Sequence, residues 1–193
     1  YNAMHIDGEN YFSQNFSDTY FSSNDCRKIG YIRDDIDKKY KEGKINEREK
    51  SVLITSLIYS MDRVANTVGH YDAYRKIENI QDKFFMYMID INKNGETKSH
   101  ISNEDANEFI KEVKADLVYI DTPYNSRQYG DAYHLLENIA EWKKPDVEGV
   151  AKKMVNRKHI KSKYCTQKAP EAFKELIDNI NAKYIMVSYN NMA

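Results

Sequence analysis

A short run near the middle of the chain combines the groups needed to hold a flat ring that bears an amine. Asp121, Thr122, Pro123 and Tyr124 directly follow the apolar residues 117–120, which are typical of a buried strand. The Asp121 carboxylate and a neighbouring main-chain carbonyl can accept hydrogen bonds from an exocyclic amine, and the Tyr124 ring can stack on the heterocycle. At the carboxyl end of a strand in an open α/β sheet, such residues usually mark a ligand crevice.

This tetrad and the residues after it resemble the Dam-like adenine-specific DNA methyltransferases of the alpha class, which carry Asp-Pro-Pro-Tyr at this point. The continuation that carries the resemblance is Asn125-Ser126-Arg127-Gln128-Tyr129, followed by Tyr133-His134-Leu135-Leu136. The chain departs from the motif once, because Thr122 replaces the first Pro; it keeps the carbonyl but loses the fixed φ of proline.

The resemblance implies a chemistry and a set of residues. It implies methyl transfer from S-adenosylmethionine, with no metal, to the exocyclic amine of an adenine flipped out of double-stranded DNA. The implied catalytic residues are Asp121, Thr122, Pro123 and Tyr124. Asp105 and Asp121 are candidate cofactor-binding residues, although a plain helix N-cap is the alternative role for Asp105.

Candidate DNA contacts lie in two segments. The loop after the tetrad offers Asn125, Arg127, Gln128 and Tyr129, and the alternative for this loop is that it satisfies its own main chain. Residues 152–168 carry seven basic side chains and no acidic one. A solvated face is the plain interpretation of this run, but beside a base-binding tetrad it is better interpreted as a phosphate-contacting segment. The candidates there are Arg157, Lys158, Lys161 and Lys163. A DNA-facing role is also considered for His70, Tyr71 and Arg75.

Composition limits the class of protein. The chain has 193 residues, is 41% hydrophobic and carries a net charge of −1, which fits a soluble domain and does not by itself indicate a nucleic-acid binder. No apolar run is long enough for a membrane span, and no secretory signal is evident. Cys26 and Cys165 lie far apart and the five histidines are scattered, so reduced thiols, a cytoplasmic location and no metal site are predicted.

Periodicity predicts two antiparallel helices in the first half. The first covers residues 25–41, capped by Asn24, and the second runs from a capping box at Asn46 to Gly69. The ring-rich residues 10–23 are expected to form an ordered loop packed on the domain.

The second half predicts alternating strands and helices. The expected elements are a strand over 84–91, a turn at 92–95, a strand over 97–102, a helix from 103, a central strand over 116–121, a helix from Gly130 to before Pro145, a helix opened by Pro170, and a final strand over 184–189. This alternation predicts an α/β fold with a parallel sheet. With the resemblance, it predicts a partial Rossmann-like S-adenosylmethionine-dependent methyltransferase sheet with a helical insert.

The predicted division places a mainly helical insert, expected to be the target-recognition region, in residues 1–83 and the catalytic half in residues 84–193. The family's glycine-rich cofactor turn is missing, since no two glycines are closer than 13 positions. The chain is therefore expected to be a fragment: a truncation, a frameshift product, or one half of a split enzyme whose partner polypeptide supplies the turn.

Three functions are compared. The leading one is site-specific DNA adenine methylation of the restriction–modification or solitary type. The others are a non-catalytic DNA-binding remnant, and a protein-glutamine or RNA methyltransferase. Asp121 argues against the last, since related tetrads there tend to begin with Asn.

Overall fold

The protein is described by a computed structural model that covers residues 1–91 and 98–190. The chain divides into two compact units, Tyr1–Ile91 with Gly130–Arg157 (unit 1) and Asn92–Tyr129 with Lys158–Ala193 (unit 2). This division does not follow the predicted boundary after residue 83, because residues 130–157 return to pack with the first 91. The target-recognition role of the helical part stays a prediction.

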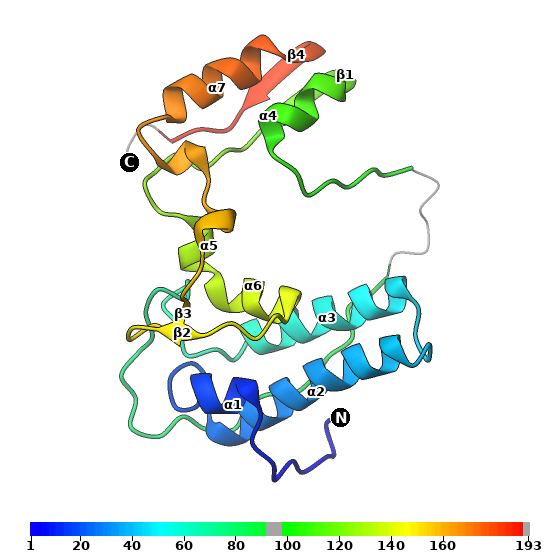
Figure 1. Ribbon diagram of the computed structural model, residues 1–193, viewed down its shortest axis with the longest axis vertical. Coiled ribbons are helices and arrows are strands. Elements are labelled where there is room, and N and C mark those ends of the chain that lie inside the picture. The colour runs from blue at the N-terminus through cyan, green and yellow to red at the C-terminus, as the bar shows by residue number, and fades with distance from the viewer. Residues whose placement is uncertain (92–97, 191–193) are drawn as a thin grey trace. The chain divides into compact units, whose positions relative to one another are not determined.

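Unit 1 is built mainly on the helices α1 (Tyr11–Phe16), α2 (Ser23–Lys41), α3 (Glu47–Asp62) and α6 (His134–Glu141) (Figure 1). α1 packs on α2, α2 on α3, and α3 on α6. The predicted capping box is confirmed, since Asn46 and Glu49 exchange side-chain and main-chain hydrogen bonds. α2 begins before the predicted residue because Ser22, not Asn24, is its cap and accepts from the Asp25 N–H at 3.1 Å.

Aromatic rings form the core of unit 1. Phe12, Phe16, Tyr20 and Phe21 are all buried, which confirms that the ring-rich segment packs on the domain. The prediction of a loop is wrong for residues 11–16, because Asn10 supplies a capping box that starts a helix.

α3 ends at Asp62, well before the predicted Gly69. Buried Asn66 explains the difference, because its side-chain amide donates to the Thr19 and Arg75 carbonyls at 2.9 and 2.8 Å. These bonds hold the following residues in a loop, in which Val68 is half exposed.

The predicted strand over 84–91 is not formed, because side chains satisfy its main chain. Asp25 accepts from the N–H groups of Lys83 and Phe84 at 2.7 and 3.0 Å. Three further N–H groups donate to side chains: Met86 to Asn2, Tyr87 to Ser60 and Ile89 to Ser56. Residues 98–102 also form no strand, and the predicted turn lies outside the described residues.

The second segment of unit 1 begins at Gly130, within α5 (Tyr129–Ala132). The predicted single helix from Gly130 is interrupted at Tyr133, after which α6 begins. Arg33 on α2 is buried and donates to the carbonyls of Ile139 and Ala140 at the end of α6. β2 (Val147–Glu148) and β3 (Lys153–Met154) then form a short antiparallel pair.

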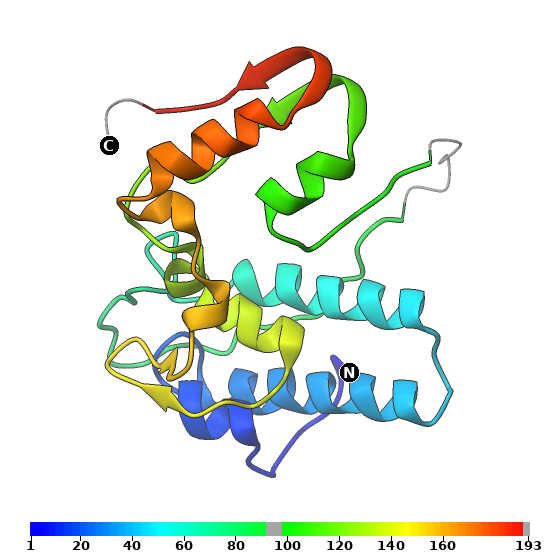
Figure 2. The same cartoon turned by 45° about the horizontal axis from the view of Figure 1, so that its top comes forward.

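Unit 2 contains a parallel strand pair. β1 (Lys114–Ile120) pairs with β4 (Asn181–Val187), which confirms the predicted parallel sheet. α7 (Ala169–Asp178) lies along this pair (Figure 2), and Ile110, Ile120 and Leu176 are buried between helix and sheet. The remaining elements are α4 (Ala106–Phe109), η1 (Ile110–Glu112), η2 (Lys158–Ile160) and η3 (Lys163–Cys165).

The predicted central position of β1 is not realised among the described residues, where β1 pairs with β4 alone. The larger Rossmann-like sheet stays a prediction. Across residues 1–91 and 98–190, no helix has the length and apolar character to cross a bilayer.

Candidate active site

The tetrad begins at the carboxyl end of β1. Asp121 follows Ile120, the last residue of the strand, and the Ser188 N–H donates to the Ile120 carbonyl at 2.9 Å. The residues after β1 and those after β4 therefore leave the sheet at the same edge. This is the edge at which open α/β sheets place their ligands.

The two side chains with the clearest predicted roles are accessible. Asp121 is exposed and Tyr124 is 37% exposed, so neither is sealed in the core. The Tyr124 ring meets the Tyr189 ring edge-on, with centroids 6.2 Å apart and an interplanar angle of 69°. Tyr189, in the segment after β4, therefore lies against the tetrad.

A pocket of about 440 Å³ adjoins the tetrad within unit 2. It is lined by Thr122, Pro123, Tyr164, Ala169, Pro170, Phe173, Val187 and Tyr189. Three of these eight residues carry aromatic rings, and most of the wall is apolar. The Thr122 hydroxyl is buried and has no hydrogen-bond partner among the described residues.

The loop after the tetrad partly satisfies its own main chain, as the alternative interpretation expected. The Asn125 side chain accepts from the Arg127 N–H at 2.9 Å. The Gln128 amide is used twice, because it donates to the Ser162 carbonyl at 3.1 Å and accepts from the Ser162 N–H at 2.7 Å. These two bonds hold the loop against the segment before η3. The side chains of Arg127 and Tyr129 are exposed.

Asp105 is the N-cap of α4. Its carboxylate accepts from the Asn107 N–H at 2.9 Å and lies 3.6 Å from the ammonium group of Lys163. The alternative role predicted for Asp105 is therefore confirmed, and its cofactor role stays a prediction.

The predicted basic segment is split between the two units. Arg157 belongs to unit 1 and is paired with Asp131 at 2.7 Å, and Lys153 in the same unit is paired with Asp72. Arg157 is thus bound internally, which corrects the picture of one continuous phosphate-contacting run. Lys158, Lys161 and Lys163 belong to unit 2 and are exposed.

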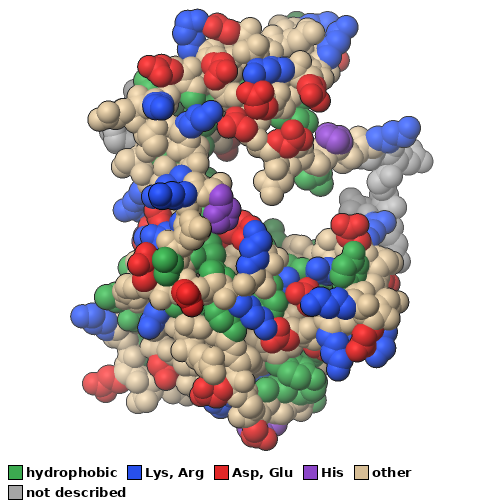
Figure 3. Space-filling view, in the orientation of Figure 1, with side chains coloured by type: hydrophobic (Ala, Val, Ile, Leu, Met, Phe, Trp, Pro, Cys, Tyr) green, Lys and Arg blue, Asp and Glu red, His purple; other side chains and the backbone are tan. Residues whose placement is uncertain are grey.

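Two further observations bear on DNA contact. Tyr71 is buried and its hydroxyl donates to Asp62 at 2.8 Å, so the DNA-facing role considered for this residue is wrong. On the face of unit 1 seen in Figure 3, basic and acidic side chains are interspersed, with no broad field of one sign.

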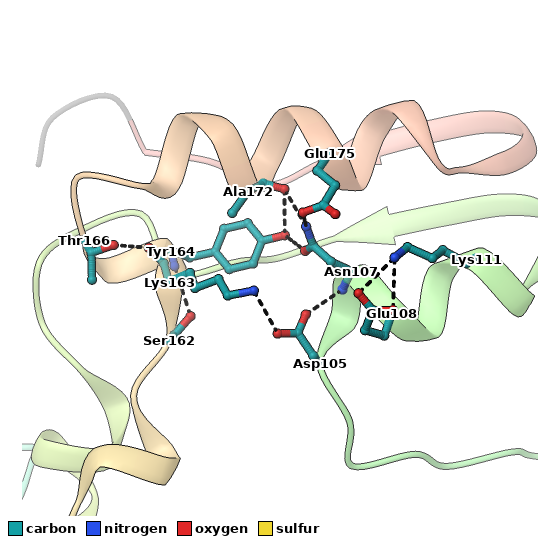
Figure 4. A network of polar contacts seen from close by, with 10 residues as sticks. All are labelled: Asp105, Asn107, Glu108, Lys111, Ser162, Lys163, Tyr164, Thr166, Ala172 and Glu175. Atoms are coloured by element: carbon teal, nitrogen blue, oxygen red, sulfur yellow. Dashed lines mark hydrogen bonds and ion pairs between the residues drawn. The ribbon is translucent and has the colours of Figure 1, made fainter.

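A polar network behind the pocket was not anticipated (Figure 4). The Tyr164 hydroxyl donates to Asn107 Oδ1 at 2.5 Å, and Asn107 Nδ2 donates to the Ala172 carbonyl and to Glu175 at 2.9 and 2.8 Å. Asn107 is only 2% exposed. The residues of this network are far apart in the chain, so no local pattern could have indicated it.

The sequence predicted reduced thiols and no metal site. Cys26 and Cys165 are both free and buried. Within the described part of the chain, no group of three or more His, Cys, Asp or Glu side chains is arranged to hold a metal ion.

Comparisons with known proteins bear on the chain as a whole. The family model of the D12 class N6 adenine-specific DNA methyltransferases matches residues 2–192. The chain is 40% identical over 174 residues to the modification methylase StsI of Streptococcus sanguinis, which covers 89% of this chain and 26% of that protein. It is 37% identical over 177 residues to the type II methyltransferase M.FokI of Planomicrobium okeanokoites, covering 89% and 27%.

A shorter relative is the type II methyltransferase M.NlaIII of Neisseria lactamica, 33% identical over 174 residues, covering 89% of this chain and 51% of that protein. The chain thus spans between 26% and 51% of the length of these relatives. No solved structure gives a significant match. The tetrad had suggested an adenine-methylating family, and the match over nearly all residues settles the membership: this chain belongs to the D12 class N6 adenine-specific DNA methyltransferases.

Proposed function

We propose that this chain carries the base-binding part of a site-specific DNA adenine methyltransferase. One observation carries the proposal: an exposed carboxylate, Asp121, and an accessible ring, Tyr124, follow β1 at the sheet edge, beside a ring-lined pocket. The family membership and the likeness to modification methylases support a role in restriction–modification.

The chemistry required of the site is positioning. The exocyclic nitrogen of adenine is a poor nucleophile, because its lone pair is delocalised into the ring. Hydrogen bonds donated by this amine to the Asp121 carboxylate and to the Thr122 carbonyl favour a pyramidal nitrogen with a free lone pair. Tyr124 replaces on one face the stacking that the base loses when it leaves the duplex.

DNA contact is assigned to the exposed residues of unit 2. Arg127 and Tyr129 follow the tetrad, and Lys158, Lys161 and Lys163 add positive charge, which suits the strand backbone. Asn125 and Gln128 are proposed to act by shaping the loop, because their side chains bind its main chain or the neighbouring segment. Arg157 is left out of the contact surface because it is paired with Asp131.

S-adenosylmethionine fits the residues present only in part. When bound, it supplies a methyl group already activated by a sulfonium charge. Asp121 and Asp105 offer exposed carboxylates, and the buried Thr122 hydroxyl is unsatisfied among the described residues. The glycine-rich turn is absent from these 193 residues, so the proposal includes a further polypeptide segment that supplies it. It also includes a cytoplasmic location, consistent with two free cysteines.

The absent turn favours one alternative, a DNA-binding remnant that engages adenine without methylating it. Long-read sequencing of DNA from a bacterial host without adenine methylases separates the two, when the host expresses this chain together with a polypeptide that carries the glycine-rich turn. The proposal expects N6-methyladenine in one sequence context. Asp121→Ala should lower its level roughly 100- to 1,000-fold, the usual loss for one hydrogen-bonding group at the reacting centre.

The matched control is Asp116→Ala. Asp116 is an exposed carboxylate on β1 and is paired with Lys183 at 2.7 Å. Removing it should leave methylation unchanged. Equal methylation by Asp121→Ala and the unaltered chain would refute the assigned chemistry. Sequence-specific DNA binding without any methylated adenine would select the remnant.

A further inference from the structure

The pocket beside the tetrad is lined in part by aromatic rings. Its rings come from three separate elements: Tyr164 from η3, Phe173 from α7 and Tyr189 from the segment after β4. The centroids of Phe173 and Tyr189 lie 6.3 Å apart, so these rings also contact one another. At about 440 Å³ the pocket falls within the range of about 300–1,000 Å³ typical of small-molecule sites.

Tyr164 is held in this wall by a dedicated polar contact (Figure 4). Its hydroxyl donates to Asn107 Oδ1 at 2.5 Å, and both Asn107 amide bonds run to α7, to Ala172 and Glu175. Burial, together with the charges of Asp105 and Glu175, raises the pKa of Tyr164 to about 12, so the hydroxyl remains a donor at neutral pH. A buried amide with three partners holds the ring in one place.

We propose that this pocket binds the ring of a purine, that Tyr164 supplies one of its aromatic walls, and that Asn107 is the residue that positions Tyr164. This inference rests on the proposed function and deepens it by assigning residues outside the tetrad. The ring comes either from the adenine of the DNA or from the adenine of the cofactor, which share the same chemistry.

The pocket suits a flat ring, and the proposed function makes that ring a purine. Aromatic walls bind a flat heterocycle through its faces, whatever the base. Thr122 and Pro123 also line the pocket, so a ring within it contacts the tetrad. The Thr122 hydroxyl is buried and has no hydrogen-bond partner among the described residues.

The test uses the whole chain and adenosine as the probe. Binding is followed by ligand-observed saturation-transfer NMR, with cytidine as the competing pyrimidine. The proposal expects adenosine to bind more tightly than cytidine. It expects Tyr164→Ala to weaken adenosine about tenfold or more, in line with the loss of one base–aromatic contact.

Two further variants keep the test decisive if Tyr164→Ala alters folding. Tyr164→Phe keeps the ring but loses the bond to Asn107, so adenosine affinity should fall only about threefold. Asn107→Ala should lower the ratio of adenosine to cytidine affinity, a readout that a purely structural role would leave unchanged. The matched control is Tyr184→Ala, since Tyr184 lies on β4 outside the pocket and is 69% exposed.

Two further arms identify the source of the ring. A duplex with 2-aminopurine at the target position reports a flipped base by fluorescence, and S-adenosylhomocysteine reports the cofactor's adenine by displacing adenosine. Loss of the duplex signal in Tyr164→Ala assigns the pocket to DNA, whereas loss of S-adenosylhomocysteine binding assigns it to the cofactor.

Several outcomes overturn the proposal. They are a folded Tyr164→Ala chain that binds both probes normally, equal affinity for adenosine and cytidine, or no adenosine binding at all. In each case the Asp121-dependent methylation test remains independent, so failure of the pocket assignment is distinguishable from failure of the proposed function.

Discussion

The two units differ in how completely they bury their apolar surface. Unit 1 encloses a core of aromatic and aliphatic side chains, and its buried polar groups, such as Arg33 and His134, bond to main-chain carbonyls. Unit 2 has a small core of Ile110, Ile120 and Leu176 beneath α7. The tetrad lies in the unit with the smaller core.

The other face of the β1–β4 pair is open among the described residues. Leu117 and Tyr119 on β1 stand beside Tyr184 and Met186 on β4, and all four are more than half exposed. Parallel sheets are normally covered on both faces. The helical unit therefore holds most of the chain's buried apolar side chains, whereas the sheet unit carries the tetrad on a less enclosed frame.

The largest expected effect concerns Arg33 in unit 1. Arg33→Met leaves the carbonyls of Ile139 and Ala140 without this donor and leaves Asp37 paired with Lys50 alone, so the free energy of unfolding should fall by about 3–5 kcal/mol. Urea denaturation measures the loss. Lys50→Met removes the more exposed partner of Asp37 and should cost less than about 1 kcal/mol. Equal losses would show that α6 is not anchored by Arg33.

The next effect is a pH dependence carried by His134. Burial lowers the pKa of His134 from 6.5 to about 4, so the unfolded chain binds a proton more readily than the folded one between these values. Stability is therefore highest above the unfolded pKa and falls as pH decreases toward 4, by up to about 3 kcal/mol.

Denaturation at pH 7, 6 and 5, compared between the unaltered chain and His134→Gln, isolates this contribution. Gln keeps a donor for the Tyr71 carbonyl, which accepts from His134 Nε2 at 2.9 Å. The variant should lose less stability than the unaltered chain on acidification. Parallel curves would contradict a buried neutral imidazole.

A smaller effect tests how tightly α1 packs on α2. A methyl group at Gly30 would lie 2.0 Å from Asn10 Oδ1, the side chain that caps α1. Gly30→Ala should therefore displace the cap and destabilise unit 1 by about 1–3 kcal/mol, measured by thermal unfolding. Gly8→Ala is the control, because nothing lies within 4 Å of its added carbon.

The smallest effect is expected on the open sheet face. Tyr119→Ser removes a ring that is 57% exposed and should change the free energy of unfolding by less than about 0.5 kcal/mol. On the covered face, Ile120→Ala should cost about 2–5 kcal/mol because Ile120 is buried. A loss above about 1 kcal/mol for Tyr119→Ser would show that this face is covered in solution.

The elements predicted correctly are those whose formation depends on a few neighbouring residues. The capping box at Asn46, the helix opened by Pro170 and the strand predicted over 116–121 all depend on neighbouring residues, and each is present, the strand as Lys114–Ile120. The strand predicted over 84–91 is not formed. A β-like pattern of residues does not determine whether the main chain bonds to another strand or to side chains. Here the partners are side chains of Asn2, Asp25, Ser56 and Ser60.

The sequence alone determined the family, the tetrad and its position after a strand, since these depend on residue types and short spacings. Only the tertiary structure decided which candidate side chains are exposed and which are bonded within the protein. It pairs Arg157 with Asp131, Gln128 with Ser162 and Tyr164 with Asn107, across 26, 34 and 57 positions. Such bonds depend on the path of the chain between the partners, and that path is set by the packing of the whole unit, which no short spacing encodes.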